Sequence, residues 1–588
     1  MCGFIGGTNT EWDYHQAIQA IAHRGPDNQQ VGGDADVPMA FARLAVMDTR
    51  DVANQPMSDS DEQVWMVFNG EVYGHQRLRA TLASNGYVFK THSDSEVVLN
   101  AYLHWGDSFV DHIDGMFAIC FYDKRCGRLK LYRDRSGIKP LYYYWDGEYF
   151  GFASELKSLS VAVGEGSLSV DSTAIYDFLT YRYVPSPKTI YRNLYKLPSA
   201  HVLEFDLSKK TIVSDRSYWS LDRELCGKWN GTVGEAAEQL ESLLGSAIQD
   251  QLVADVPVGC FLSGGIDSSC IVDHASRLTD QLNTFTIGFH DSPRDESAFA
   301  QQVASHFGTD HQLRQFSLDA IDEKVEAMSR WFDEPFLDLS ALPTYMVCGV
   351  ARETATVALS GDGGDELFGG YTWYNDVPRW QRLSGRLPSR FSALFQSVRK
   401  RMPSGLIGGK LQAACRLGQI ASEETLGLLT LILSGWTPAL KRDFRRRLQI
   451  PEDYDDYWFY RLHDHPELPI KTRLQWIDFH TYLPEDLLTK VDRTSMQHSL
   501  EVRVPFLDRQ LIEFAFSLPE EIKFYQGQLK GLLRYTYRDS LPNEITRRGK
   551  QGFSIPGDQS RRLQRSSLDS IASHWIAVSE TSGGELSV

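Results

Sequence analysis

The chain has 588 residues, 42% of them hydrophobic, and a formal net charge of −17, which suits a globular protein of two or three domains. The acidic balance argues against a non-specific grip on nucleic acid or anionic membrane, because that grip needs basic patches. We therefore expect neither as a partner, whereas a locally positive site could still bind small anions.

The longest apolar stretch, residues 426–436, is too short to span a bilayer, which needs roughly 20 residues. The N-terminus shows no basic, apolar leader. Eight cysteines at irregular spacings form no CxxC pair, so they indicate neither a zinc site nor a disulfide framework. These features predict a cytoplasmic protein without a membrane segment.

The first part of the chain, to about residue 210, is rich in predicted strands. Short β-branched or aromatic runs bounded by Gly and Asp turns predict strands, and apolar periodicity predicts helices between them. The expected strands are 64–73, 115–123, 130–132 and 140–149, and the expected helices are 75–84 and 96–104.

From about residue 215 the pattern changes to strands that alternate with helices, which is typical of a parallel α/β sheet. A helix is expected at 235–251 and another from 271 onward, with strands at 256–262, 284–289 and 356–359. Residues 375–545 are mostly helical in pattern, and the tail after 560 is expected to be loosely held. No low-complexity linker separates the halves, so we expect them to pack closely.

Cys2 follows the initiator methionine directly. Removal of Met1 would give Cys2 a free α-amine with a pKa near 7.7–8.0, which can act as a general base toward its own thiol. Nucleophile and base would then lie in one residue. Taken alone, however, a cysteine at position 2 is more often an ordinary surface thiol than a catalytic residue.

Four other features of the first hundred residues suit a substrate pocket for Cys2. The turn His23-Arg24-Gly25-Pro26-Asp27 could cover a pocket, and Arg43 at a strand end could grip a carboxylate. Asn69-Gly70 pairs an amide with a flexible backbone N–H, as an oxyanion hole needs, and Asp94 could pair with a substrate ammonium. The structural alternatives are a surface ion pair for Arg43, a hairpin turn at Asn69-Gly70 and a helix N-cap at Asp94.

Together these segments resemble the class II glutamine amidotransferase domain. The matching strings, in the family's order, are MCGF, HRGPD, RLAVMD, FNGEVY, the pair Ser93-Asp94 and RDRSGIKPLYY at 133–143. The resemblance implies an N-terminal-nucleophile fold in which Cys2 attacks the glutamine γ-amide and releases ammonia. It implies glutamine binding by Arg43, Asn69, Gly70, Glu71 and Asp94, with Asn69 and Gly70 as the oxyanion hole.

A glycine-rich loop, Ser263-Gly264-Gly265-Ile266-Asp267-Ser268-Ser269, follows the strand 256–262 and precedes a helix. Glycines let the backbone approach phosphate, and N–H groups and serine hydroxyls can hold anionic oxygens. Asp267 could meet a Mg²⁺ that bridges phosphates. The structural alternative is a Gly-rich turn with a Ser N-cap. No Walker A motif is present.

A second loop, residues 360–366, follows the strand 356–359 and carries Asp362 and Asp365 among glycines. Both loops end strands of one predicted sheet, where α/β proteins bind ligands. The alternative is a solvated acidic turn. Lys530, on a predicted apolar helix, could stabilise negative charge in a transition state or simply extend to water.

The second half resembles the glutamine-hydrolysing asparagine synthetase family. Together with the N-terminal match, the resemblance covers residues 1 to about 557. The matching strings are SGGIDSS, SGDGGDELFGGY, DEPFLDLSALPTY (333–345), LLTKVDRTSMQHSLEVRVPFLD (487–508) and QLKGLLR. The family fold is an N-terminal-nucleophile αββα sandwich followed by a parallel α/β adenine-nucleotide-binding domain with helical additions. Accordingly we place a glutaminase domain at 1–212, a synthetase domain at 213–560 and a tail at 561–588.

The resemblance also implies the ATP and metal contacts. The backbones of Leu262 and Ile287 would contact the nucleotide, Asp267 and Asp365 would serve Mg²⁺-pyrophosphate, and Lys530 would support adenylation. Asp362 stands where some members carry Glu, at the position linked to forming and aminating the acyl-adenylate. The remaining ATP contacts would come from Ser263, Gly264, Gly265, Ser268, Ser269, Ser360 and Gly361.

The implied reaction converts aspartate to asparagine through a β-aspartyl-adenylate, using ATP and glutamine-derived ammonia and yielding AMP, pyrophosphate and glutamate. Ammonia would cross the domain interface, and homodimers are common among relatives. Three alternatives stay open: amidation of another carboxylate such as a sugar uronic acid or a peptide, an ATP-dependent cyclase, and a non-catalytic interaction protein. The intact set of Cys2, Arg43, Asn69 and Asp94 argues against the cyclase, and the assembled acid, Gly and Lys sites argue against the interaction protein.

Overall fold

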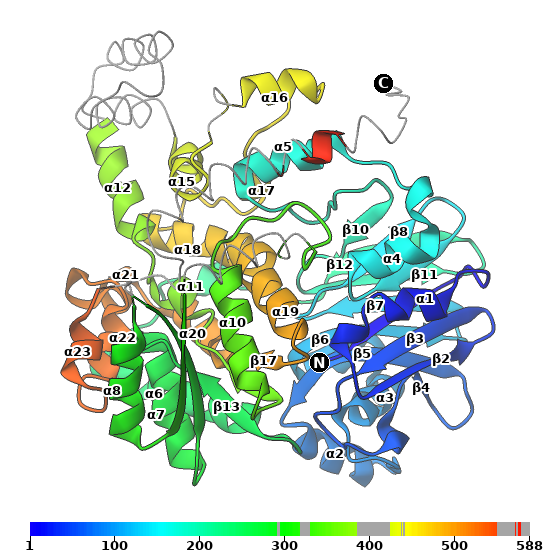
Figure 1. The fold of residues 1–588 in the computed structure, drawn as a ribbon, viewed down its shortest axis with the longest axis horizontal. Coiled ribbons are helices and arrows are strands. Elements are labelled where there is room, and N and C mark those ends of the chain that lie inside the picture. The colour runs from blue at the N-terminus through cyan, green and yellow to red at the C-terminus, as the bar shows by residue number, and fades with distance from the viewer. Residues whose placement is uncertain are drawn as a thin grey trace.

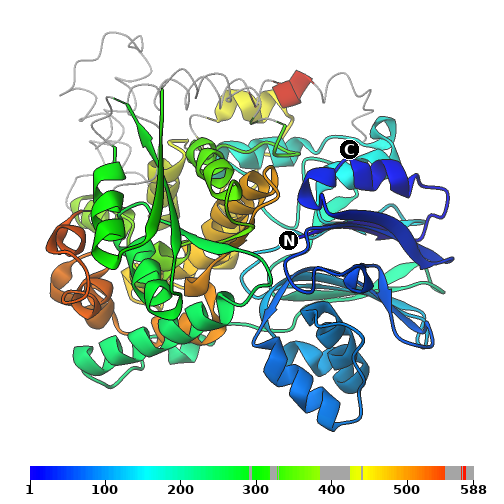
Figure 2. The ribbon, with the colours of Figure 1, turned by 60° about the horizontal axis from the view of Figure 1, so that its bottom comes forward.

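The computed structural model describes residues 1–290, 295–317, 328, 330–384, 424–436, 438, 441–549, 571 and 574–577. Most of the predicted tail 561–588 and part of the helical region 375–545 therefore lie outside the described residues. The described chain forms two parts that lie side by side, with the N-terminus between them in both views (Figures 1 and 2).

The N-terminal part contains two six-stranded antiparallel sheets, with strand orders β10-β8-β9-β1-β3-β2 and β12-β11-β7-β6-β5-β4. The strands are β1 (Gly3–Gly7), β2 (Asn28–Asp34), β3 (Val37–Arg43), β4 (Met57–Ser58), β5 (Val64–Tyr73), β6 (Asp114–Asp123), β7 (Arg128–Arg133), β8 (Tyr142–Trp145), β9 (Phe150–Ala153), β10 (Leu194–Lys196), β11 (His201–Asp206) and β12 (Thr211–Ser217).

Helices cover the outer faces of these two sheets. Alternate side chains of each strand point to opposite faces, so each sheet packs against its partner on one side and against helices on the other. Phe4, Val67 and Leu203 fill the space between the sheets, whereas Ile5 and Phe68 face the helical layers. The result is the predicted αββα sandwich. Its helices are α1 (Tyr14–Gln19), α2 (His75–Ser84), α3 (Asp94–Trp105), α4 (Leu156–Val163) and α5 (Ser172–Tyr181).

The C-terminal part is built on a five-stranded parallel sheet with the order β15-β14-β13-β16-β17, as predicted for the second half. Its strands are β13 (Val258–Phe261), β14 (Asn283–Phe289), β15 (Asp310–Phe316), β16 (Val357–Leu359) and β17 (Glu501–Arg503). The helices near it are α6 (Val233–Gln251), α7 (Ile266–Leu278), α8 (Ser297–Phe307), α10 (Ala341–Arg352), α11 (Gly364–Phe368), α12 (Trp373–Ser384), α19 (Thr489–Met496), α20 (Arg509–Ser517), α21 (Glu520–Lys523), α22 (Gly531–Thr536) and α23 (Asn543–Arg547).

A helical layer connects the top of both parts in Figure 1. It contains α15 (Thr425–Leu433), α16 (Arg442–Arg447), α17 (Trp458–Leu462), α18 (Ile470–His480) and a π-helical turn, Leu483–Leu488, that leads into α19. Of the apolar stretch 426–436, which was predicted as too short for a membrane, residues 426–433 lie in α15. Among the helices of the described residues, none is both long and apolar enough to cross a bilayer.

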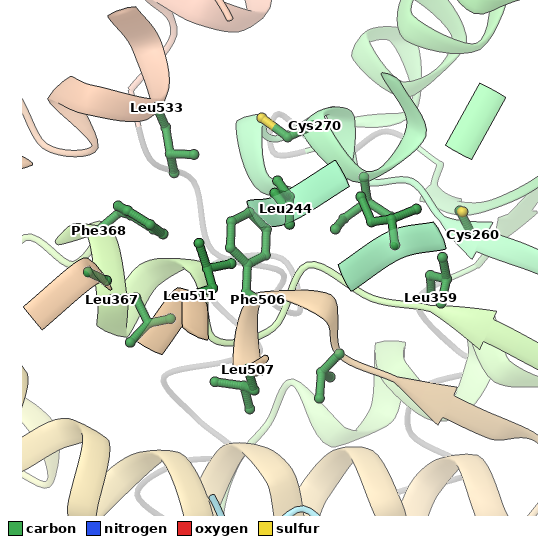
Figure 3. Close-up of a cluster of buried hydrophobic side chains, with 14 of the residues drawn as sticks. Leu244, Cys260, Cys270, Leu359, Leu367, Phe368, Phe506, Leu507, Leu511 and Leu533 are labelled. Atoms are coloured by element: carbon green, nitrogen blue, oxygen red, sulfur yellow. The ribbon is translucent and has the colours of Figure 1, made fainter. Parts of the chain in front are cut away.

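Apolar clusters hold the parallel sheet on both faces, as expected for a sheet covered by helices. Leu359 of β16 packs in one cluster with Leu244 of α6, Phe506 and Leu511 (Figure 3). Its neighbour Ala358 belongs to the cluster on the other face. Because burying one such large side chain is worth about 2 kcal/mol, these clusters fix the strand ends from which the predicted loops emerge.

Several sequence expectations differ from the structure. Residues 140–149 do not form one strand, because β8 ends at Trp145 and Asp146 accepts turn N–H bonds from Glu148 and Tyr149. The helix α7 starts at Ile266, earlier than expected, since Gly265 is its N-cap. The predicted boundary 212/213 falls within β12, and α6 begins only at Val233.

Candidate functional site

Cys2 lies just before β1, buried between the two parts of the molecule. Its N–H donates to Asn69 Oδ1 at 2.8 Å, and its Sγ is 3.8 Å from the Leu44 carbonyl oxygen. Burial raises the pKa of the Cys2 thiol, although the nearby N-terminal ammonium acts in the opposite direction. A thiol in such a place needs an adjacent base to become a nucleophile.

Asn69 and Gly70 lie in the middle of β5, opposite Ala118 and Phe117 of β6, so the hairpin-turn alternative is wrong. The Asn69 side chain is fully buried, and its Nδ2 has no hydrogen-bond partner among the described residues. A Cβ on Gly70 would overlap the Met116 carbonyl oxygen, so only glycine fits there. The pair presents an unused donor beside Cys2, which is what an oxyanion hole requires.

Arg43 ends β3 with its side chain only 6% exposed, which excludes the surface ion pair. Its Nη1 donates to the Arg50 carbonyl at 2.9 Å and to Asn54 Oδ1 at 2.7 Å. Its Nη2 donates to the carbonyl oxygens of Met47, at 3.2 Å, and of Asp48. The loop after β3 therefore fixes the guanidinium at the pocket wall.

Asp94 is the first residue of α3, and Ser93 rather than Asp94 is the N-cap. Asp94 Oδ2 accepts from Val72 N–H at 2.9 Å, and burial raises the pKa of its carboxyl. Glu71, also on β5, faces β17 of the C-terminal part, where its Oε2 accepts from Arg503 Nη2 at 3.2 Å. Burial, with Asp94 nearby, raises the pKa of Glu71 well above its usual value.

These side chains share one cavity. Cys2, Arg43, Gly70, Glu71 and Asp94 all line it, and Asn69 reaches it through its bond to Cys2. Three further polar residues of the lining, Gln55, Ser95 and Glu501, were not predicted as site residues. Gln55 pairs with the backbone of Phe68 on β5, and Glu501 comes from the other part of the molecule.

Arg24 of the HRGPD turn does not cover this pocket as expected. It is fully buried between the two parts and binds Glu155, at 2.8 Å, and Asp492, at 2.7 Å. Its Nε donates to the Cys2 carbonyl at 2.9 Å. The turn is therefore held by buried ion pairs and contacts the backbone of Cys2.

The second candidate site is a cavity at the carboxyl ends of β13, β14 and β16. The loops after these strands converge there, as expected for an open parallel sheet. Its lining includes these predicted residues: Leu262, Ser263, Gly265, Asp267, Ser268, Ile287, Ser360, Gly361, Asp362, Asp365 and Lys530.

Gly264 and Ser269 were predicted as ATP contacts but do not belong to the described lining. Ser269 is fully buried, and its Oγ donates to the Gly265 carbonyl at 2.7 Å within the first turn of α7. Gly264 has φ +70°, and a Cβ there would lie 2.6 Å from Ala300 N. The conformation and the packing against α8 both demand glycine, so Gly264 shapes the loop.

Lys530 lies between two carboxylates in this cavity, with its Nζ paired to Asp267 Oδ2 and Asp365 Oδ1. It was predicted on a helix, but it precedes α22 with a left-handed backbone, φ +55°. A side chain on Gly370 would overlap both Asp365 and Lys530, so the glycine after α11 makes room for the triad.

The two carboxylates fit a Mg²⁺ ion that is shared with phosphate oxygens, because hard cations prefer oxygen ligands and Mg²⁺ usually takes one or two from protein. Both Asp267 and Asp365 approach the same Lys530 ammonium, so they already surround one cationic position. Within the described ranges, no group of three or more His, Cys, Asp or Glu side chains could hold a metal by itself. The remaining ligands would be water and substrate phosphate oxygens.

Asp362 and Glu366 complete the acidic loop. Ser360 Oγ donates to Asp362 Oδ2 at 2.5 Å, which fixes Asp362 at the cavity wall. Glu366 is fully buried and accepts from Tyr371 O–H at 2.6 Å. Burial, together with the neighbouring Asp365 charge, raises the pKa of Glu366 to about 8. Glu366, in α11, lines the cavity but was not predicted as a site residue, since the sequence does not reveal that this carboxyl is buried.

Comparisons with known proteins match both halves. The family described as "Glutamine amidotransferase domain" matches residues 1–219, and the family described as "Asparagine synthase" matches residues 239–582. Asparagine synthetase [glutamine-hydrolyzing] 1 of Bacillus subtilis is 32% identical over 570 residues, covering 95% of this chain and 87% of the relative.

Two other relatives show the spread of the family. A putative asparagine synthetase [glutamine-hydrolyzing] 2 of Methanocaldococcus jannaschii is 33% identical over 549 residues, covering 86% of this chain and 100% of the relative. Amidase chry2 of Gibberella zeae is 27% identical over 594 residues, covering 92% of this chain and 84% of the relative. The chain belongs to the family of glutamine-hydrolysing asparagine synthetases, carbon–nitrogen ligases that use glutamine as the amide donor.

Proposed function

We propose that this enzyme amidates aspartate to asparagine, through a β-aspartyl-adenylate, with ATP consumed and AMP, pyrophosphate and glutamate released. The observation that carries the proposal is the presence of two built sites in one chain. One is the cavity around Cys2, and the other is the cavity around the Asp267–Lys530–Asp365 triad. Their chemistries are complementary, since one releases ammonia and the other activates a carboxylate.

In the first site, Cys2 Sγ attacks the γ-amide carbon of glutamine after Met1 has been removed. The Cys2 α-amine takes the thiol proton and gives it to the departing nitrogen. Asn69 Nδ2, which is unpaired among the described residues, and the backbone at Gly70 hold the developing oxyanion. We assign the glutamine carboxylate to Arg43 and its ammonium to Asp94, with Glu71 beside them. Water then hydrolyses the γ-glutamyl thioester to glutamate.

In the second site, a carboxylate oxygen of aspartate attacks the α-phosphorus of ATP, and the bond to pyrophosphate breaks. We assign nucleotide binding to the backbones of Leu262 and Ile287 and to the loops after β13 and β16. Lys530 is placed to stabilise negative charge on the phosphates, and Asp362 faces the acyl group. Mg²⁺ at Asp267 and Asp365 would neutralise pyrophosphate charge when bound.

Ammonia then attacks the acyl carbon of the adenylate, and AMP leaves. The coupling of two sites follows from acid–base chemistry, because free ammonia is mostly protonated at neutral pH and the ammonium ion is not nucleophilic. Transfer across the buried domain interface keeps the nitrogen away from bulk water. A cytoplasmic location and a homodimer remain predictions from the sequence.

A second candidate is amidation of a different carboxylate, and the similarity to an amidase over 92% of this chain favours keeping it in the test. The glutaminase cavity and the nucleotide loops would serve either acceptor equally. The two candidates differ only in which acid stimulates pyrophosphate release.

The test measures pyrophosphate, AMP and asparagine with ATP, Mg²⁺, glutamine and one carboxylate at a time. We expect aspartate to stimulate pyrophosphate release and to yield asparagine with AMP. If another acid but not aspartate stimulated pyrophosphate release, that acid would be the acceptor, and the two-site scheme would still hold. In parallel, Cys2→Ala should lose glutamine-dependent synthesis and keep synthesis from ammonium chloride; loss of both would contradict two separate sites.

A further inference from the structure

The N-terminal ammonium of the glutaminase part binds a carboxylate of the synthetase part. Glu501 Oε2 lies 2.6 Å from the Met1 nitrogen, and both side chains are essentially buried, at 0% and 1% exposure. Burial by itself would raise the pKa of Glu501, but the ammonium and Arg503 outweigh it and lower that pKa to about 2. The carboxylate is therefore charged at neutral pH and faces a buried cation.

Arg503 fixes the orientation of Glu501. Its Nε donates to Glu501 Oε1 at 2.7 Å, while its Nη1 donates to the carbonyl oxygens of Gln251 and Val253, each at 2.7 Å. Its Nη2 reaches Glu71 of the glutamine cavity. One carboxylate oxygen of Glu501 thus binds the guanidinium and the other binds the terminal ammonium, so the carboxylate group is fixed in one orientation.

The backbone of Glu501 belongs to the synthetase sheet. It lies in β17, which pairs in parallel with β16 so that Glu501 aligns with Val357 and Arg503 with Leu359. One residue further, Ser360 N–H donates to the Arg503 carbonyl at 2.9 Å. The strand that presents Glu501 to the first site therefore also anchors the acidic loop of the second site.

Removal of Met1 moves the terminal ammonium by one residue, to the Cys2 nitrogen. That nitrogen is already held by Asn69 Oδ1 at 2.8 Å. Glu501 lines the same cavity as Cys2, so its carboxylate faces the pocket in which the new ammonium is formed. Arg24, held by Asp492 of α19, fixes the Cys2 carbonyl from the other side.

We propose that Glu501 is a positioning residue for glutamine hydrolysis: a synthetase-domain carboxylate that holds the α-amine of Cys2 in place and stabilises its charged form during thioester formation. The inference rests on the proposed role of Cys2. In that step the amine becomes an ammonium when it takes the thiol proton and returns to the neutral amine when it protonates the leaving nitrogen. A fixed anion lowers the energy of the charged intermediate state.

The experiment compares Glu501→Gln with the wild-type chain in three assays. These are glutamate release from glutamine, synthesis with glutamine, and synthesis with ammonium chloride. We expect kcat for glutamate release to fall at least about tenfold, with KM for glutamine within about twofold because Arg43 and Asp94 are unchanged. Synthesis from ammonium chloride should stay within about twofold. Glu501→Asp, which keeps the charge, should recover part of the lost kcat.

The matched control is Asp250→Asn. Asp250 of α6 also crosses the interface, pairing with Arg77 at 2.7 Å, but both side chains are partly exposed and neither lines the Cys2 cavity. We expect no change in any of the three assays, since such exposed pairs contribute little.

Each outcome supports or overturns the proposed role of Glu501. Unchanged kcat in Glu501→Gln would overturn the inference, and so would equal loss of glutamine- and ammonium-dependent synthesis, because Glu501 would then merely support the interface. Failure of Glu501→Asp to exceed Glu501→Gln would also overturn it, since charge would not matter. If Cys2→Ala still released glutamate, the proposed function itself would fail, irrespective of Glu501.

Discussion

Asn69 illustrates how much chemistry a single buried side chain carries. Its Oδ1 holds the Cys2 nitrogen, and its Nδ2 has no other partner among the described residues. We predict that Asn69→Ala lowers kcat for glutamate release about 10²- to 10³-fold, the usual effect of removing one oxyanion donor. KM for glutamine should change little, because the carboxylate and ammonium contacts remain. Steady-state kinetics of glutamate release measures both.

Asn85→Ala is the matched control for this prediction, because Asn85 caps α2 on the exposed surface. Its kinetics should equal those of the wild type. A rise in KM without a fall in kcat for Asn69→Ala would show that Asn69 binds glutamine in the ground state instead of stabilising the oxyanion.

At single positions, the sequence could predict a site residue where the residues that work together lie in one short motif or at the chain start. The placement of Cys2 beside the Asn69-Gly70 pair, and of the loop with Asp267 at the end of a strand, could be predicted in this way. Glu501 could not, since its partner lies 500 residues away in sequence and only docking of the two parts reveals it. The backbone of Lys530 was also missed, because a left-handed conformation is uncommon for a residue other than glycine and the residue type gives no sign of it.

Among the secondary-structure elements, those with a clear period were predictable. The helix α2 and the strand β5 agree with the expected ranges to the residue. The alternation of strands and helices predicted the parallel sheet, but not β17, a three-residue strand without a period of its own. Its pairing with β16 is tertiary information, as is the burial of α18 against its neighbours.

The helix α18 ends in a histidine, His480, that packs against a second histidine. His480 stacks on His463 at 5.0 Å, and its Nδ1 lies 2.8 Å from the Trp476 carbonyl oxygen. Burial lowers the pKa of His480 to about 4 and that of His463 to about 3. Both rings are therefore neutral in the folded protein at pH 5, whereas in the unfolded chain they would be mostly charged.

We predict that acidification from pH 7 to pH 5 destabilises this layer. A histidine whose pKa is lower in the folded than in the unfolded protein contributes its full stabilisation of the fold above the unfolded pKa, near 6.5. This stabilisation is lost as the pH falls toward the folded pKa of His480, about 4. Because both rings are partly exposed, we expect about 1 kcal/mol per histidine over this range rather than the full linkage value. Thermal midpoints at pH 7, 6 and 5 should fall less in His480→Phe than in the wild type.

The exposed His15 of α1 provides the control for this pH dependence. His15→Gln should leave the slope of the midpoint against pH unchanged. An identical slope in His480→Phe and the wild type would show that the pKa of His480 is the same in the folded and unfolded protein.

At the scale of the whole molecule, buried ion pairs join the two parts near Cys2. Arg24 binds Asp492, and Arg493 binds Glu155 at 2.8 Å, so each part supplies a guanidinium to a carboxylate of the other. Lys196 of β10 extends the network by binding Glu334 at 2.5 Å and Glu485 at 3.3 Å. Such pairs favour one relative position of the parts, because any other leaves buried charges without partners.

We predict that Lys196→Met lowers the free energy of unfolding by about 3 kcal/mol, because it leaves Glu334 and Glu485 buried without their ammonium partner. Calorimetry or denaturant unfolding measures the loss. Lys124→Met is the matched control, since Lys124 pairs with Asp34 at 2.7 Å on the surface, and its removal should change the free energy of unfolding far less. If the interface also couples the sites, Lys196→Met should lower glutamine-dependent synthesis more than ammonium-dependent synthesis. Equal stability of the two variants would show that the buried network adjusts by protonation or solvent entry, and the docking of the parts would then depend on apolar packing instead.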